Sequence, residues 1–131
     1  MKNLPIVECE KLLTDSANRK KADRIVSAFG FRADLKGSDR LADCVILYGS
    51  NAASGFCEIY RIVGKLRDTG AKAVLRTINY AMSRAYGMTD KLSELVGANI
   101  PRNEIHNSLV IAHLGKIYRY DSPRETGGGD D

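Results

Sequence analysis

The chain has 131 residues, of which 44% are hydrophobic and 27% charged, the size and composition of one globular domain. Lysine and arginine number 20 against 16 aspartates and glutamates, and so modest an excess indicates a polyanionic partner only where the charge is clustered. The sequence has no CxxC pair, no signal-peptide pattern and no run near the roughly 20 apolar residues of a membrane span. We therefore expect a cytoplasmic protein with free thiols and no membrane contact.

The first periodic segment covers residues 16–29. Ala22, Ile25 and Phe29 repeat at helical spacing, and either Asp15 or Ser16 is suited to cap the start of a helix. The same helix carries the densest positive charge of the chain, at Arg19, Lys20, Lys21 and Arg24. This cluster is interpreted either as a solvated helix face or as a face that contacts phosphates.

The middle of the chain predicts further helices. Residues 39–48 fit a helix better than a short buried strand, and residues 56–66 and 71–85 each show a clear helical stripe. Residues 44–55, which contain a Gly-Ser turn, resemble the phosphate-binding loop of nucleotidyltransferases. The Asp-x-Asp pair that this resemblance requires is missing, so we expect a loop between two helices.

The C-terminal third has the order helix, glycine, helix, strand. A short helix is predicted over residues 90–96, with Leu92, Leu95 and Val96 on its inward face and Gly97 at its end. After a turn at residues 99–101, a second helix is predicted over residues 102–113, closed by Leu114 and Gly115. Ile105, Leu109 and Ala112 form the expected core face of this second helix. Residues 116–121 alternate in the manner of a strand.

This segment, from Leu92 to Leu109 and on through Leu114-Gly-Lys-Ile-Tyr-Arg, resembles the winged helix-turn-helix superfamily of transcription regulators. The resemblance implies that the second helix enters the major groove of duplex DNA and that the wing contacts the backbone. The residues expected to contact DNA are Arg102, Asn103, His106 and Asn107 on the helix, Lys116, Tyr118 and Arg119 on the wing, and Arg19, Lys20 and Arg24 near the N-terminus.

The second helix also departs from this pattern. Val110, Ile111 and Leu114 make the predicted outer face apolar, which favours a homodimer that covers it. An alternative function is a small protein–protein interaction module, such as an inhibitor or adaptor from a mobile element, that does not bind nucleic acid.

The sequence does not predict an enzyme. His106 and His113 lie two turns apart on the predicted helix, too far to share a metal ion, and no catalytic residue set, metal or cofactor is predicted. The expected fold is mainly α: a compact bundle of five or six helices with a C-terminal helix-turn-helix, at about residues 88–121, and a short β wing. Residues 1–123 form the single predicted domain, and residues 124–131 a disordered tail.

Overall fold

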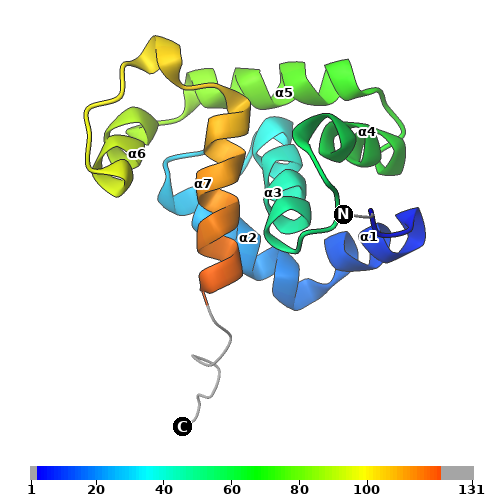
Figure 1. Cartoon of the computed structure of the whole chain (residues 1–131). Coiled ribbons are helices and arrows are strands. Elements are labelled where there is room, and N and C mark those ends of the chain that lie inside the picture. The colour runs from blue at the N-terminus through cyan, green and yellow to red at the C-terminus, as the bar shows by residue number, and fades with distance from the viewer. Residues whose placement is uncertain (1–2, 122–131) are drawn as a thin grey trace, which may run out of the picture.

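The computed structural model of the chain describes residues 3–121 and is entirely helical over that range (Figure 1). Its seven α-helices are α1 (Ile6–Thr14), α2 (Ser16–Ala28), α3 (Lys36–Gly49), α4 (Phe56–Leu66), α5 (Ala71–Arg84), α6 (Met88–Val96) and α7 (Asn107–Tyr120), with a 3-10 turn at Arg102–Glu104. The predicted mainly α fold is confirmed, with more helices in this part of the chain than the five or six expected. The predicted tail at residues 124–131 lies outside the described residues.

Helix α3 is the central element, and α1, α2, α4, α5 and α7 all pack against it (Figure 1). All of its residues from Leu41 to Leu47 are buried, including the charged Asp43. A helix that is apolar nearly all round is stable only when it is surrounded by protein, and this one is. The helix interpretation of residues 39–48 is therefore confirmed, and the helix begins three residues earlier, at Lys36.

Two glycines of α3 allow its neighbours to approach closely. A Cβ atom on Gly37 would lie 2.1 Å from the backbone oxygen of Thr77 in α5. A Cβ on Gly49 would lie 2.5 Å from the ring of Tyr118 and 2.9 Å from the backbone oxygen of Gly115, both in α7. The N-terminal end of α3 is thus fixed against α5 and its C-terminal end against α7.

In the C-terminal segment, the predicted bounds of the second helix are wrong, and the residues predicted to form a β wing are helical. Residues 102–104 form the separate 3-10 turn, α7 begins only at Asn107, and residues 116–120 continue this helix instead of forming a strand. Gly115 does not end a helix: it lies inside α7, where a Cβ would come within 2.4 Å of the Tyr48 ring. Close packing against α3 is the physical reason for this glycine, and no residue from 3 to 121 forms the β wing.

The predicted faces of the C-terminal helices also need correction. Val110, Ile111 and Leu114, expected on the outside, have no exposed surface because α3 and the rest of the chain cover them. In α6, Leu92 is buried as expected, whereas Leu95 is 46% exposed. The apolar residues that favoured a homodimer therefore belong to the core of a single chain. The homodimer stays a prediction, but these residues no longer support it.

Candidate nucleic-acid interface

The four residues predicted to read DNA bases lie at the start of α7. Arg102, Asn103 and His106 are exposed there, in the connection from α6. Asn107 is half-buried: its amide oxygen accepts a hydrogen bond from the hydroxyl of Tyr60, and its amide nitrogen donates to Asn79 Oδ1 at 3.1 Å. Asn107 therefore joins α7 to α4 and α5, and the three exposed residues lie at the end of α7 beside α5 (Figure 1).

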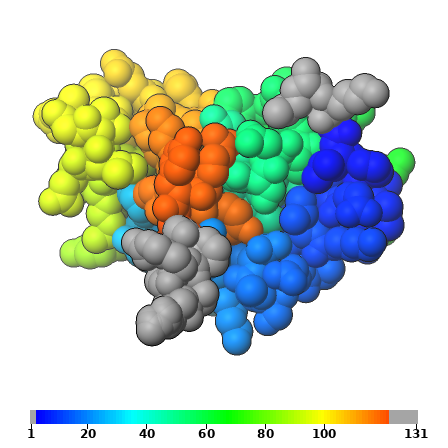
Figure 2. Space-filling model, turned by 60° about the horizontal axis from the view of Figure 1, so that its bottom comes forward, coloured from blue at the N-terminus to red at the C-terminus, as the bar shows by residue number. Residues whose placement is uncertain are grey.

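The residues predicted for the wing lie at the other end of α7. Lys116 is exposed in the last turns of the helix, about 14 Å from Asn107 along its axis. Tyr118 is buried, with Lys21 Nζ 4.3 Å from the centre of its ring. Arg119 donates hydrogen bonds to the backbone oxygens of Tyr48 and Gly49, so it caps the C-terminal end of α3. Figure 2 shows this end of α7 at the surface between α6 and the α1–α2 pair.

The predicted basic cluster of α2 is divided in the structure. Arg19 points into the protein, where its guanidinium donates to Asp43 Oδ1 at 2.6 Å and to Asp39 Oδ1 at 2.8 Å. Lys20 and Arg24 are exposed one turn apart on the outer side of the helix. Of the two predicted caps, Asp15 is the one that caps α2, since its carboxylate accepts from the backbone N–H of Asn18. Of the three predicted phosphate contacts on α2, two are on the surface.

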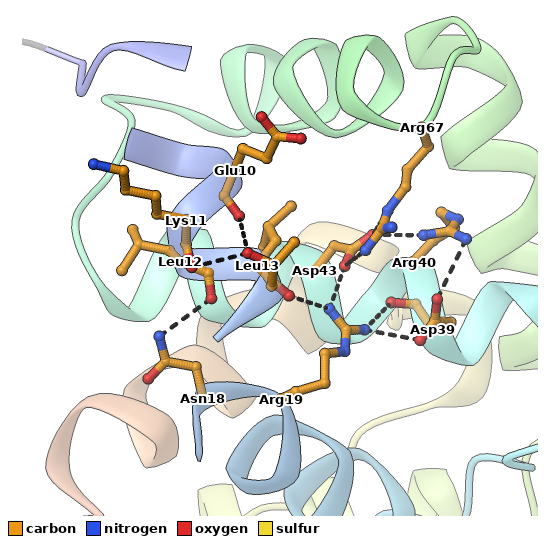
Figure 3. Close-up of polar contacts among 11 residues, drawn as sticks. Glu10, Lys11, Leu12, Leu13, Asn18, Arg19, Asp39, Arg40, Asp43 and Arg67 are labelled. Carbon is orange, nitrogen blue, oxygen red and sulfur yellow. Dashed lines mark hydrogen bonds and ion pairs between the residues drawn. The ribbon is translucent and has the colours of Figure 1, made fainter. Parts of the chain in front are cut away.

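The partners of Arg19 belong to a partly buried ion-pair cluster around Asp43, which we call the Asp43 cluster (Figure 3). It contains three arginines and two aspartates: Arg19, Arg40, Arg67, Asp39 and Asp43. Arg19 and Arg67 approach the Asp43 carboxylate from opposite sides, and Arg40 donates to its Oδ2 at 2.6 Å. Arg67 binds the same carboxylate through both Nε, at 2.9 Å, and Nη2, at 2.7 Å. A fully buried carboxylate is tolerated because both of its oxygens accept charged hydrogen bonds.

The electrostatics of the cluster keep its arginines charged. Burial lowers the pKa of Arg19, but the hydrogen bond to Asp43 and the charges of Asp43 and Asp39 outweigh burial and raise it overall. The hydrogen bond to Asp43 also raises the pKa of Arg67. The carboxylates of Asp43, Asp39 and the nearby Asp23 therefore stabilise the charged form of Arg19.

A face of α5 carries exposed basic residues and no carboxylate. Lys72, Arg76, Tyr80 and Arg84, which we call the α5 face, follow one another at intervals of four residues, and all are exposed. The guanidinium carbon of Arg84 lies 5.7 Å from the centre of the Tyr80 ring. Positive charge next to an exposed aromatic ring suits a ligand with both phosphates and flat bases.

A hollow of about 230 Å³ opens beside this face, between the start of α3 and the first half of α5. It is lined by three basic side chains and by residues of the α4–α5 region: Lys36, Arg40, Arg67, Thr69, Ala73, Val74 and Thr77. Ala73 and Thr77 lie on the side of α5 next to Arg76, so the hollow and the α5 face are continuous. Arg40 and Arg67 reach it from the Asp43 cluster.

The α5 face and the hollow were not among the predicted sites. The sequence does contain a signal for the α5 face, since residues 69–89 include basic residues and no aspartate or glutamate. The hollow has no comparable signal, since its basic residues come from separate helices that only the fold brings together. Comparisons with known proteins add no further assignment: no family model, curated protein or solved structure matches the chain. Among the described residues, the helices are too short or too polar to cross a membrane.

Proposed function

We propose that this protein binds nucleic acid, and that the α5 face is the surface that contacts it. The observation that supports the proposal most directly is the exposed, carboxylate-free row of Lys72, Arg76 and Arg84 around Tyr80. Nucleic-acid affinity comes largely from basic side chains that neutralise phosphates, and exposed aromatic rings add stacking on bases. A regulatory role on duplex DNA, as the sequence predicts, is one use of such a surface.

The α5 face is a better candidate than the predicted helix-turn-helix. Residues 97–106 connect α6 to α7, a longer connection than the three or four residues of a typical helix-turn-helix. Helix α6 also packs loosely, so it provides little support for α7, and α7 itself is largely buried. Arg102, Asn103 and His106 extend the α5 face at its edge, because the start of α7 lies beside α5.

The proposal is tested by fluorescence anisotropy with a labelled random-sequence duplex and a single strand of the same length. Binding is measured at several salt concentrations for the parent protein and for Lys72→Ala/Arg76→Ala. If these two side chains each neutralise a phosphate of the duplex, the slope of log K against log salt becomes shallower by about 2 in the variant. Single-strand binding that exceeds duplex binding and falls in Tyr80→Ala identifies stacking on Tyr80 as the larger contribution.

The chain offers a matched control on α2. Lys20→Ala/Arg24→Ala removes the same pair of residue types, at the same spacing, from an exposed helix on the other side of α3 (Figure 1). We expect this variant to bind like the parent protein. Equal losses in both variants indicate diffuse attraction by net charge, and a loss only in the α2 variant shows that the predicted N-terminal cluster is the contact surface. Either result contradicts the assignment to α5.

A protein–protein interaction module is a second candidate function. It is favoured by a mainly apolar hollow of about 340 Å³ between α6 and α7, lined by Leu95, His113, Lys116, Ile117 and Tyr120. Contacts made by apolar surface respond little to salt, whereas phosphate contacts weaken steeply. No detectable nucleic-acid binding at low salt favours this second candidate, in which the α6–α7 surface is the contact.

A further inference from the structure

The hollow beside α5 has more positive charge than its own carboxylates neutralise. Its lining contains three basic side chains, Lys36, Arg40 and Arg67, and no carboxylate, and the buried carboxylate of Asp43 behind it is shared among three arginines. The charge of Lys36 is not neutralised, because this side chain is exposed on the wall of the hollow and forms no ion pair with any residue from 3 to 121. This lining suits a small anionic group with several acceptor oxygens, such as a phosphate monoester.

Hydrogen-bond donors in the hollow are only partly used by the protein. Arg67 binds Asp43 through Nε and Nη2, and within residues 3–121 its Nη1 makes no hydrogen bond. The hydroxyl of Thr69 likewise has no partner there, whereas Thr77 donates its hydroxyl proton to the backbone oxygen of Ala73 at 2.7 Å. Arg67, Thr69 and Lys36 therefore supply available donors, and Thr77 forms part of the wall.

The buried carboxylate fixes the position of these donors. Asp43 has no exposed surface and holds both Arg40 and Arg67 by hydrogen bonds of 2.6 to 2.9 Å. A guanidinium that is already ordered loses little side-chain entropy when an anion binds. The first turns of α3 and α5, which border the hollow, have no side-chain cap, and their backbone N–H groups add partial positive charge.

We infer that this hollow is a phosphate monoester site, and that it binds the terminal phosphate of a nucleic-acid strand whose backbone lies along the α5 face. This inference rests on the proposed function for the source of the phosphate, and on the hollow alone for its chemistry. A volume of about 230 Å³ is below the roughly 300 Å³ at which sites for drug-sized ligands begin. The hollow therefore holds a phosphate group, and the nucleoside attached to it lies outside, next to Tyr80.

The test compares oligonucleotides that differ only in a 5′ phosphate or a 5′ hydroxyl. Binding is measured by anisotropy for the parent protein, for Lys36→Ala and for the control Lys20→Ala. We expect the parent to bind the phosphorylated strand at least about tenfold more tightly, the effect of one charge-assisted hydrogen bond. Lys36→Ala loses most of this preference and Lys20→Ala keeps it. A nucleoside 5′-monophosphate and inorganic phosphate, followed by backbone NMR shifts, serve as separate probes of the hollow.

The outcomes separate this inference from the proposed function. Equal binding of both oligonucleotides, with no shift at residues 36, 67 and 69 on adding phosphate, overturns the phosphate site even if the nucleic acid binds. Phosphate or nucleotide shifts at these residues without oligonucleotide binding support the site and identify a small phosphorylated molecule as its ligand, against the proposed function. A 5′-phosphate preference that survives Lys36→Ala places the terminal phosphate elsewhere and overturns the inference.

Discussion

At the scale of single residues, Asp43 is a buried charge that depends on three arginines. Its side chain is fully buried, and the three arginines around it are between 15% and 31% exposed. In Asp43→Asn the amide nitrogen, itself a donor, faces guanidinium donors, and the arginines lose their counter-charge. We expect the free energy of unfolding, measured by urea denaturation, to fall by about 3 kcal/mol, the lower end for breaking a buried ion pair because the arginines are partly hydrated.

Asp34→Asn is the matched control for this change. Asp34 pairs with Arg32, but both side chains are more than half exposed, so solvent screens their attraction. The hydrogen bond from Arg32 lowers the pKa of Asp34, yet the unfolding midpoint at neutral pH is expected to change little. Similar losses of stability in both variants would show that Asp43 acts as an ordinary surface charge.

Burial is also expected to make the three cysteines differ in reactivity. Burial raises the pKa of Cys44, with a contribution from Asp43, and burial together with Glu8 raises the pKa of Cys9. Since the thiolate is the reactive form and these thiols stay protonated near pH 8, both are expected to resist alkylation. Cys57 is exposed. Mass spectrometry after iodoacetamide treatment should find one label in the native protein and three in urea, and rapid labelling of a second cysteine would contradict the burial.

At the scale of elements, the contact between α3 and α5 shapes the hollow. A methyl group on Gly37 would meet the backbone oxygen of Thr77 at 2.1 Å and the Cβ of Ala81 at 2.7 Å. Because the backbone has to move, Gly37→Ala should lower the free energy of unfolding, measured by urea denaturation, by about 1 to 3 kcal/mol, in spite of the higher helix propensity of alanine. Gly55→Ala, where a Cβ meets nothing within 4 Å, should change stability by less than about 1 kcal/mol. A Gly37→Ala protein as stable as the parent would contradict this packing.

Helical periodicity predicted the middle of the fold well. The helix over residues 56–66 agrees with α4 at both ends, because its apolar stripe begins after Gly55 and ends before the turn. Helix α1 was missed although Ile6, Cys9 and Leu13 have helical spacing, since no glycine marks either of its ends and α2 follows it at once. The C-terminal error arose at Gly115, which was interpreted as the end of a helix. The glycine is needed for close packing against Tyr48, and this tertiary contact cannot be recognised in the sequence.

The candidate site was harder to predict than the fold. A basic residue looks the same in sequence whether it reaches solvent or a buried carboxylate, and Arg19 and Arg119 both make internal hydrogen bonds. The basic row on α5 was visible in the sequence as polar positions of a helix. The hollow beside it was not, because it depends on Lys36 and Arg67, which α3 and the α4–α5 turn bring beside α5. Convergence of separate helices on one hollow is a property of the tertiary fold.

At the scale of the whole molecule, stability is expected to be uneven. Helix α3 is enclosed by five other helices, and all side chains from Leu41 to Leu47 are buried. Helix α6 buries only Met88 and Leu92 and packs less closely than any other helix of residues 3–121. A segment with few buried apolar contacts opens locally at a lower free energy than the global unfolding.

Native-state hydrogen exchange measures this difference directly. Amides in the middle of α3 should exchange only through global unfolding, so their opening free energy should equal the value from urea denaturation and fall in parallel with it in Asp43→Asn. Amides in α6 should exchange at least about a hundredfold faster than those of α3, which corresponds to a difference of about 2.7 kcal/mol in opening free energy. Their exchange should hardly respond to Asp43→Asn, because local opening of α6 leaves the Asp43 cluster intact. The control is α5, which packs on α3 and α4 and should follow α3. If α6 is as protected as α3 and responds equally to Asp43→Asn, the protein unfolds as one cooperative unit and the loose attachment of α6 is wrong.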